Sequence, residues 1–167
     1  MSLNFSIFGQ GIVDTSYSNW PNEEIMIKAI GVDGMPYDLN KNLEHTINAS
    51  HSNLKKLDLS KMVVSLNASY SNFEDADFSY TYFGWADITG SYVEGLNLRS
   101  ARGKIDLEHT LGSPRLRGCY FHTIKADRYF KSRLSKKDKK YLEKYYILDD
   151  NLAKMGIFVW KHITLTI

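Results

Sequence analysis

The sequence has a single cysteine, three prolines and no long apolar run. One thiol excludes an internal disulfide and suits a reducing compartment, so we expect a cytoplasmic protein. No window of about 18 apolar residues exists, so no membrane-spanning helix is expected. The first residues, Met1 to Phe5, lack the basic and apolar segments of a signal peptide, and none is expected.

The short motifs that mark common catalytic and cofactor sites are also missing. There is no Gly-rich phosphate loop, no nucleophile elbow and no paired-cysteine metal signature. Cys119 and His122 lie three residues apart, but a catalytic pair also needs a cleft and an orienting third group. We expect a buried, inert thiol, and a non-enzymatic protein with no cofactor and no bound metal.

What the sequence does contain is a period of five residues between Ile47 and about Phe121. A large apolar residue recurs at every fifth position, a small residue usually lies two before it, and Asn or Asp often lies between them. The clearest run is Ser71-Asn72-Phe73, Ala76-Asp77-Phe78, Thr81-Tyr82-Phe83, Ala86-Asp87-Ile88, Ser91-Tyr92-Val93, Leu96-Asn97-Leu98. Helices need a period of 3.6 and half-buried strands a period of 2, so this pattern indicates a stacked solenoid.

The period weakens on both sides of this run. An earlier run ends at Val64, nine residues before Phe73, which predicts that one residue has been lost from the register. A later run is degenerate and is centred on Leu111, Leu116 and Phe121, with Cys119 at a small inward position.

These triplets resemble the pentapeptide-repeat family, whose pattern is Ala-(Asp/Asn)-(Leu/Phe) followed by two free positions. The resemblance implies a mainly β fold, a right-handed quadrilateral β-helix in which four pentapeptides form one coil. The large apolar residue and the small residue before it would point inward. Positions twenty apart would then stack, with Phe73 under Val93 and Phe78 under Leu98.

We expect three regions along the chain. Residues 1–45 would form an N-terminal β-hairpin cap, residues 46–124 the pentapeptide-repeat β-helix, and residues 125–167 a C-terminal helix and strand. In the first region, the Ile-rich segment 24–30 predicts a strand, and Asp33-Gly34 predicts a turn. Such a cap would cover the apolar end of the solenoid.

The third region carries helix signals and then strand signals. Ser135 is a predicted N-cap, and an apolar stripe from Leu134 to Met155 predicts one amphipathic helix that Gly156 ends. The segment 157–167 predicts a strand, which we expect to pair with the N-terminal hairpin or with a second copy of the chain.

The net charge of +2 conceals two regions of opposite sign. Residues 70–98 hold five acidic and no basic residues, whereas residues 125–144 hold nine basic and three acidic residues. The lysines of the basic region are typical of the solvated face of a helix, so nucleic acid is not the expected partner. A membrane is not expected either.

Within the acidic region, Glu74 and Glu94 fall at equivalent positions of neighbouring coils, where like charges repel. Two interpretations stay open: Lys55, one coil earlier, neutralises Glu74, or the acidic residues form a stripe that imitates DNA. Outward aromatic residues of the same region are typical anchors of interfaces, or alternatively a stabilising stack of rings. We predict a protein-binding surface from these acidic and aromatic residues: Glu74, Asp75, Asp77, Trp85, Asp87, Tyr92 and Glu94.

Three functions follow as hypotheses. The first is a protein-binding module, for which the resemblance implies a DNA-handling enzyme such as a topoisomerase, or a bacterial defence enzyme, as partner. The second is a homodimeric scaffold or spacer, assembled through the C-terminal helix and strand. The third is a hydrolase or metal site built on the repeated Leu-Glu-His-Thr motif, with Glu44, His45, Glu108 and His109.

Overall fold

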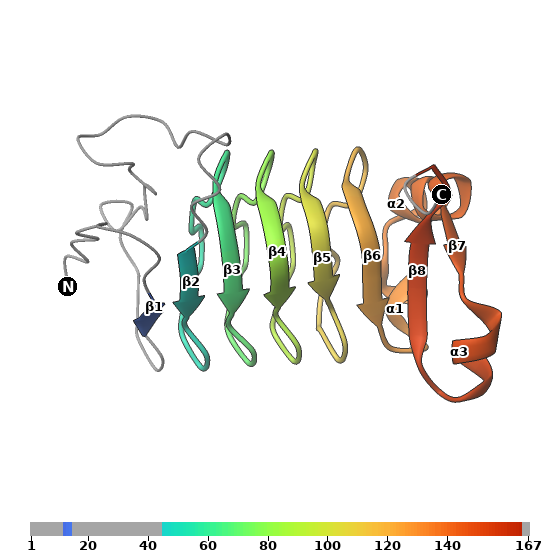
Figure 1. Ribbon diagram of the computed structural model, residues 1–167, viewed down its shortest axis with the longest axis horizontal. Coiled ribbons are helices and arrows are strands. Elements are labelled where there is room, and N and C mark those ends of the chain that lie inside the picture. Colours follow the sequence, from blue (N-terminus) through green and yellow to red (C-terminus); the bar gives the residue numbers. More distant parts are fainter. Residues whose placement is uncertain (1–11, 15–44, 165–167) are drawn as a thin grey trace.

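The strands of the protein lie side by side in a row from the N-terminal to the C-terminal end (Figure 1). The computed structural model describes residues 12–14 and 45–164, which form a β-solenoid of about 4 turns with short C-terminal helices and a strand. The expected hairpin of residues 24–37 lies outside the described residues. The elements are β1 Ile12–Asp14, β2 His45–Asn48, β3 Val63–Asn67, β4 Tyr82–Asp87, β5 Arg102–Asp106, β6 Tyr120–Ala126, α1 Phe130–Arg133, α2 Lys136–Tyr145, β7 Tyr146–Leu148, α3 Asp150–Lys154 and β8 Phe158–His162.

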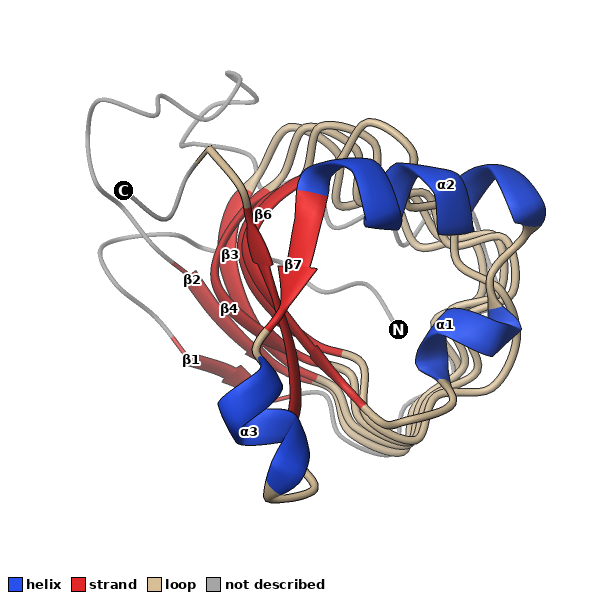
Figure 2. Cartoon of the chain, turned by 90° about the vertical axis from the view of Figure 1, so that its right-hand side faces the viewer, coloured by secondary structure: helices blue, strands red, loops and turns tan. Residues whose placement is uncertain are grey.

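Strands β1 to β6 pair in parallel and form one side of the solenoid, while turns and loops close the rest of each coil (Figure 2). Away from these strands, isolated bridges join successive coils in two rows: Asn53, Asn72, Tyr92 and Leu111, and Asp58, Asp77, Asn97 and Arg115. Phe73 N donates to Tyr92 O at 2.8 Å, and Phe78 N donates to Asn97 O at 2.9 Å. The predicted stacking of residues twenty apart is therefore confirmed in the middle coils.

The lost residue that the spacing predicts is found in β3. Val64 pairs with Phe83 and Leu66 pairs with Ala86, so Ser65 alone occupies the stretch that Gly84 and Trp85 fill in β4. The coil before this point is accordingly one residue shorter than the next. Asn53 bridges to Asn72 across nineteen residues, and Asn72 bridges to Tyr92 across twenty.

The inward positions form a continuous apolar core. In the clearest run every large apolar residue and every small residue two before it is buried. Phe78 lies between two ring neighbours, with centroids 5.4 Å from Phe73 and 5.3 Å from Phe83. Leu111 is the exception: it pairs with outward Tyr92 and is exposed, so its predicted inward placement is wrong.

Buried serines in the small inward positions connect neighbouring coils through hydrogen bonds. Ser71 Oγ donates to Ala49 O at 2.9 Å and accepts from Ser52 N at 3.0 Å, while Ser71 N donates to Ser91 Oγ at 3.0 Å. A buried hydroxyl costs free energy unless it is bonded, and here it also satisfies backbone groups. These positions therefore need a small side chain, and serine adds coil-to-coil bonds that alanine cannot make.

The C-terminal region differs from the prediction in two ways. Ser135 is the N-cap of α2, as expected, and accepts from Asp138 N at 3.2 Å. The single long helix is wrong, because α2 ends at Tyr145 and the next residues form β7, which pairs with β8. Tyr146 there buries its ring and donates from Oη to Phe121 O at 2.9 Å, so contacts with the last coil override the helical stripe.

Strand β8 closes the open edge of the solenoid. It pairs antiparallel with β6 on one side and with β7 on the other. The expectation that it pairs with the N-terminal hairpin or with a second copy is therefore wrong. An exposed sheet edge is a site of aggregation, and β8 covers this one from within the chain.

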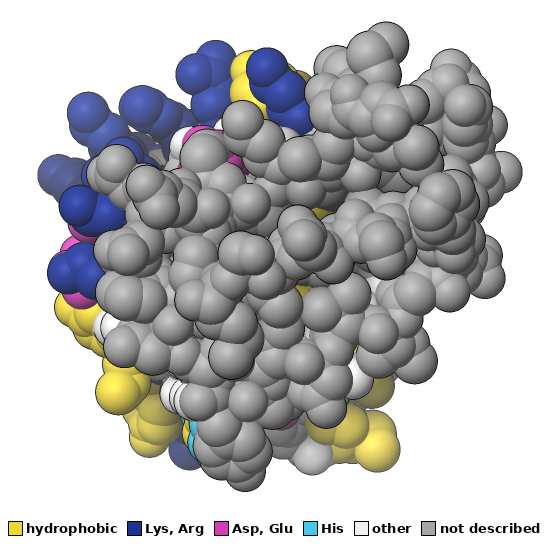
Figure 3. Space-filling model, turned by 90° about the vertical axis from the view of Figure 1, so that its left-hand side faces the viewer, with side chains coloured by type: hydrophobic (Ala, Val, Ile, Leu, Met, Phe, Trp, Pro, Cys, Tyr) yellow, Lys and Arg dark blue, Asp and Glu magenta, His cyan; other side chains and the backbone are white. Residues whose placement is uncertain are grey.

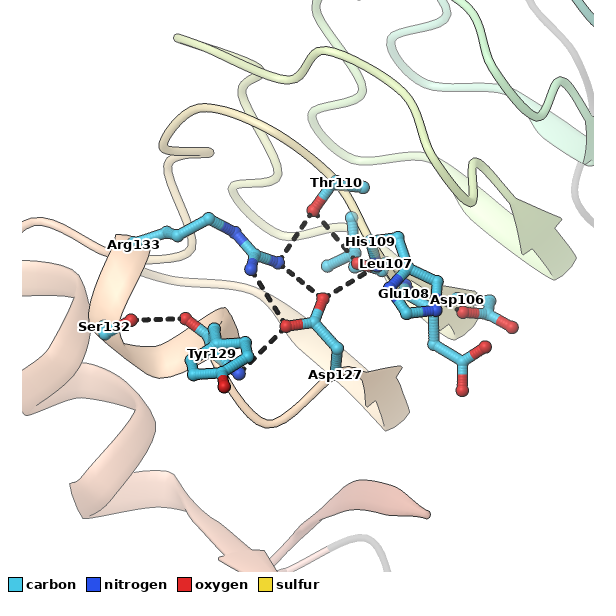
Figure 4. A network of polar contacts seen from close by, with 9 residues as sticks. All are labelled: Asp106, Leu107, Glu108, His109, Thr110, Asp127, Tyr129, Ser132 and Arg133. Atoms are coloured by element: carbon cyan, nitrogen blue, oxygen red, sulfur yellow. Dashed lines mark hydrogen bonds and ion pairs between the residues drawn. The ribbon is translucent and has the colours of Figure 1, made fainter. Parts of the chain in front are cut away.

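A bidentate ion pair fastens α1 to the last coil (Figure 4). Arg133 Nη1 and Nη2 donate to the two carboxylate oxygens of Asp127 at 2.9 and 2.8 Å. The same carboxylate accepts from His109 N at 2.7 Å and Tyr129 N at 2.9 Å. The bonds from Arg133, followed by those from the backbone, hold the pKa of Asp127 well below its usual range.

Candidate functional site

The seven predicted partner-binding residues lie on three different sides of the solenoid. Glu74, Asp75, Tyr92 and Glu94 follow the row of bridges that joins Asn72 to Tyr92. Asp77 belongs to the other row of bridges, and Trp85 and Asp87 belong to β4. The structure therefore brings together four of the seven.

Asp77 and Asp87 bind turns within their own coils. Asp77 Oδ1 accepts from Ser79 N at 2.9 Å, and Asp87 Oδ1 accepts from Thr89 N at 3.0 Å. This bond to the backbone two residues later is the Asx turn, and the same bond recurs at Asn72, Asn97 and Asp106. The Asn or Asp of the repeat thus has a structural role. This role accounts for Asp77 and Asp87, and no binding partner is needed to explain them.

Trp85 lies among charges of both signs. Its ring is 43% exposed and borders a shallow groove of about 310 Å³ that Lys104, Lys125 and Asp106 also line. Lys125 Nζ lies 3.7 Å from Asp106 and 3.3 Å from Glu108, and burial raises the pKa of Asp106. The strand side is therefore mixed in charge rather than acidic.

Glu74 and Glu94 do lie on neighbouring coils, and each has its own partner. Lys55 Nζ lies 3.0 Å from Glu74 Oε2, and the hydrogen bond to Glu74 raises the pKa of Lys55. Glu94 Oε2 accepts from Ser113 N at 2.7 Å. Neutralisation by Lys55 is thus confirmed, and the acidic row is only two residues long.

Beside the two glutamates lies an apolar pair that the sequence interpretation only half identified. Tyr92 is 39% exposed, and its bridge partner Leu111 on the next coil is 64% exposed. Aligning Thr110-Leu111-Gly112 with Ser91-Tyr92-Val93 places Leu111 outward, so the sequence did contain evidence for the exposure of Leu111. We name Glu74, Asp75, Tyr92, Glu94 and Leu111 the Tyr92–Leu111 surface.

The residues that could act as nucleophiles or metal ligands are either buried or dispersed. Cys119 is fully buried, its Sγ lies 3.4 Å from Tyr146 Oη, and burial raises its pKa to about 11. Among residues 12–14 and 45–164 no three His, Cys, Asp or Glu side chains cluster as a metal site. Glu44 lies outside the described residues, Glu108 pairs with Lys125, and His109 donates its backbone N–H to Asp127.

No helix in the described part of the chain is long and apolar enough to cross a membrane.

Comparison with known proteins agrees with the repeat geometry. Residues 66–102 match the model of the pentapeptide repeats family, with eight copies. No curated protein and no solved structure matches the chain. The matched segment contains the coils in which residues twenty apart stack, the core residues Phe73, Phe78 and Phe83, and most of the Tyr92–Leu111 surface. Over residues 66–102, this chain belongs to the pentapeptide-repeat family.

Proposed function

We propose that this protein is a non-enzymatic, cytoplasmic protein-binding module whose partner docks on the Tyr92–Leu111 surface. The observation that carries the proposal is the adjacent exposure of Tyr92 and Leu111 on successive coils, bridged to each other and flanked by Glu74 and Glu94. The interior needs neither side chain, because both point away from the core.

The composition of this surface fits a docking site better than a solvated one. Interfaces place aromatic and apolar side chains at the centre and charged groups at the rim. Leu111 and Tyr92 would supply the centre, and Asp75, Glu74 and Glu94 the rim. The carboxylates favour a partner with a basic surface, because complementary charge speeds association and excludes wrong partners.

An enzyme that handles DNA has such a basic surface. The family resemblance adds a topoisomerase as the first candidate, or a bacterial defence enzyme. Because the acidic row is short and Glu74 is paired with Lys55, apolar contact rather than extended imitation of DNA would carry most of the affinity.

A supercoiling assay with bacterial DNA gyrase tests this partner. We expect the protein to alter supercoiling, and a Glu74→Lys, Glu94→Lys variant to need at least about tenfold more protein for the same effect. The matched control is Glu143→Lys, Asp150→Lys, which changes the net charge equally on the C-terminal helices and should act like the native protein. No effect at a large molar excess, or an equal loss in the control, would contradict the proposal.

The shape of the coils is part of the same proposal. The resemblance implies a right-handed, four-sided coil. Two separate rows of bridges, in addition to the row of strands, support several distinct sides. A crystal structure would test it, and a left-handed or three-sided coil would refute it.

Assembly of two copies is the second candidate, favoured by one feature of the C-terminal end. β7 is the outermost strand of the sheet there, and Ile147 within it is 60% exposed. Light scattering over a range of concentrations tests it: an Ile147→Lys variant should reduce the mass of a dimer, and a native protein that stays monomeric removes the candidate.

A further inference from the structure

A basic groove runs along the C-terminal end of the solenoid, between the last coils and α2. It consists of two hollows of about 690 and 610 Å³, which share Arg117, Gly118 and Lys137 in their walls. The first is lined by the coil residues Arg99 and Arg115, and the second by Lys140 and Lys144 of α2. The groove therefore combines cations from the solenoid and the helix, whereas the sequence interpretation considered the helix alone.

The cations of this groove are not neutralised. Six belong to it, and none forms an ion pair with any residue in the described ranges: Arg99, Arg115, Arg117, Lys137, Lys140 and Lys144. The nearby acid of α2, Glu143, pairs instead with Lys131 at 2.7 Å. Seen from the N-terminal end, Lys and Arg side chains also gather along the upper left edge of the molecule (Figure 3).

The one carboxylate in the lining, Asp138, is already bound. It is only 7% exposed, and its Oδ1 accepts from Leu116 N and Arg117 N at 2.9 Å each. Its Oδ2 accepts from Ser135 Oγ. These bonds fix the N-terminal end of α2 against the coil and occupy both oxygens of the carboxylate.

Two exposed aromatic rings lie among these cations. Tyr120 and Tyr145 line the second hollow and are 47% and 36% exposed. Lys144 Nζ lies 5.2 Å from the centroid of the Tyr145 ring, and Tyr145 itself stacks near His162. The rings are held in place, and each keeps part of its surface open to the groove.

We propose that the basic groove binds single-stranded nucleic acid. Unpaired Arg and Lys side chains would contact the phosphates, and Tyr120 and Tyr145 would stack on bases, which is the combination typical of sites for single strands. An acidic protein segment would satisfy the cations but has no flat bases for the rings. The site is separate from the Tyr92–Leu111 surface, so either proposal can fail alone.

Fluorescence anisotropy with a labelled 20-nucleotide oligo(dT) tests this site. Six phosphate contacts on a single strand give a slope of about −4 for log affinity against log salt, so binding should weaken about 300-fold between 50 and 200 mM salt. The variant Arg115→Gln, Arg117→Gln, Lys140→Gln should lower the slope to about −2 and weaken binding at least about tenfold.

Two further variants separate a built site from general positive charge. Lys56→Gln, Lys136→Gln, Lys154→Gln loses the same charge outside the groove and should bind almost as the native protein does. Tyr145→Leu keeps the charge and should weaken oligo(dT) binding about fivefold or more, because stacking is lost. Circular dichroism checks that each variant is folded.

Three results would overturn the proposal. The first is no binding of oligo(dT) at 50 mM salt. The second is an equal loss in the groove variant and the charge-matched control. The third is a 20-residue poly-glutamate that binds as tightly as oligo(dT), with Tyr145→Leu unchanged, which would make the groove a site for an acidic protein.

Discussion

The middle coils and the C-terminal end of this protein are held together by different means. From Leu66 to Arg102 successive coils repeat one another, and buried apolar rungs stack at a spacing of nineteen or twenty residues. From Leu116 onward the coil is closed by particular polar contacts: Asp127 with Arg133, Asp138 with two backbone N–H groups, and Tyr146 with Phe121 O. The first region depends mainly on the volume of its inward side chains, with hydrogen bonds that recur from coil to coil, and the second depends on individual contacts that occur once.

The same comparison shows which parts of the structure a periodic sequence can specify. A repeat specifies which residues point inward, and it leaves its outward positions free to vary. The end of the solenoid must cover apolar rungs and sheet edges once, so its contacts are unique and have no period. The basic groove lies where the regular coils meet this end, whereas the Tyr92–Leu111 surface lies mostly on the regular coils and extends to Leu111 on the next one.

The largest effect on stability is expected from truncating a large inward side chain of the middle coils. Phe78→Ala should lower the free energy of unfolding by about 4 kcal/mol, because a buried ring that touches two others leaves a cavity. Tyr82→Ala, on the outward side of β4, should cost less than about 1 kcal/mol. Urea denaturation measures both, and similar losses would remove the distinction between inward and outward positions.

A smaller but still large effect is expected at Gly103, where the period fails. Its φ is +95°, and a Cβ there would lie 1.7 Å from Phe83 O on the coil before, so Gly103→Ala should cost about 3 kcal/mol. Gly156 also has a positive φ, +79°, but nothing lies within 4 Å of its added Cβ. Gly156→Ala should therefore cost only about 1 kcal/mol. Thermal unfolding compares the two, and equal losses would show that backbone conformation alone decides.

At the C-terminal end, Asp127→Asn should cost about 2 kcal/mol at neutral pH, because the charge-assisted bonds from Arg133 are weakened. The folded pKa of Asp127 lies below its unfolded value. Its contribution is thus complete above about pH 4 and is lost as the pH falls below that value. The difference in melting temperature between the native protein and the variant should stay constant from pH 7 to about pH 4 and should narrow at pH 3, without vanishing there, because the folded pKa lies lower still. A difference that does not narrow at pH 3 would show that the charge of Asp127 is not responsible, and Asp150→Asn is the control.

The smallest effect is expected from a single hydroxyl. Tyr146→Phe removes the bond to Phe121 O, at about 1 kcal/mol. Tyr145→Phe changes a hydroxyl on an exposed side chain and should be neutral within about 0.5 kcal/mol. If Tyr146→Phe is also neutral, the hydroxyl of Tyr146 does not help to hold β7 against the last coil.

The middle of this fold was predicted well from the sequence because every repeat requires the same sizes and polarities at the same positions. Phe73, Phe78 and Cys119 were placed inward correctly, and the pairing of Lys55 with Glu74 followed from counting. Leu111 was wrongly predicted to point inward because the last coil is shorter than the coils before it. In a degenerate repeat, a shift of one residue changes whether a side chain points inward or outward.

The C-terminal end was predicted less well, since its pairings join residues far apart in the chain. The helical stripe continues through residues 146–148, but pairing with β8 and the bond from Tyr146 outweigh local preference there. The basic groove could not be found from the lysines of α2 alone, because three of its cations come from coils that precede the helix.

The most direct test of the proposed function is photo-crosslinking to gyrase. A benzoylphenylalanine placed at Leu111 should form a crosslink to a gyrase subunit, because Leu111 lies at the centre of the Tyr92–Leu111 surface. The same group placed at Tyr82, exposed on the strand side, should form none. Equal crosslinking from both positions, or crosslinking from Tyr82 alone, would contradict the account.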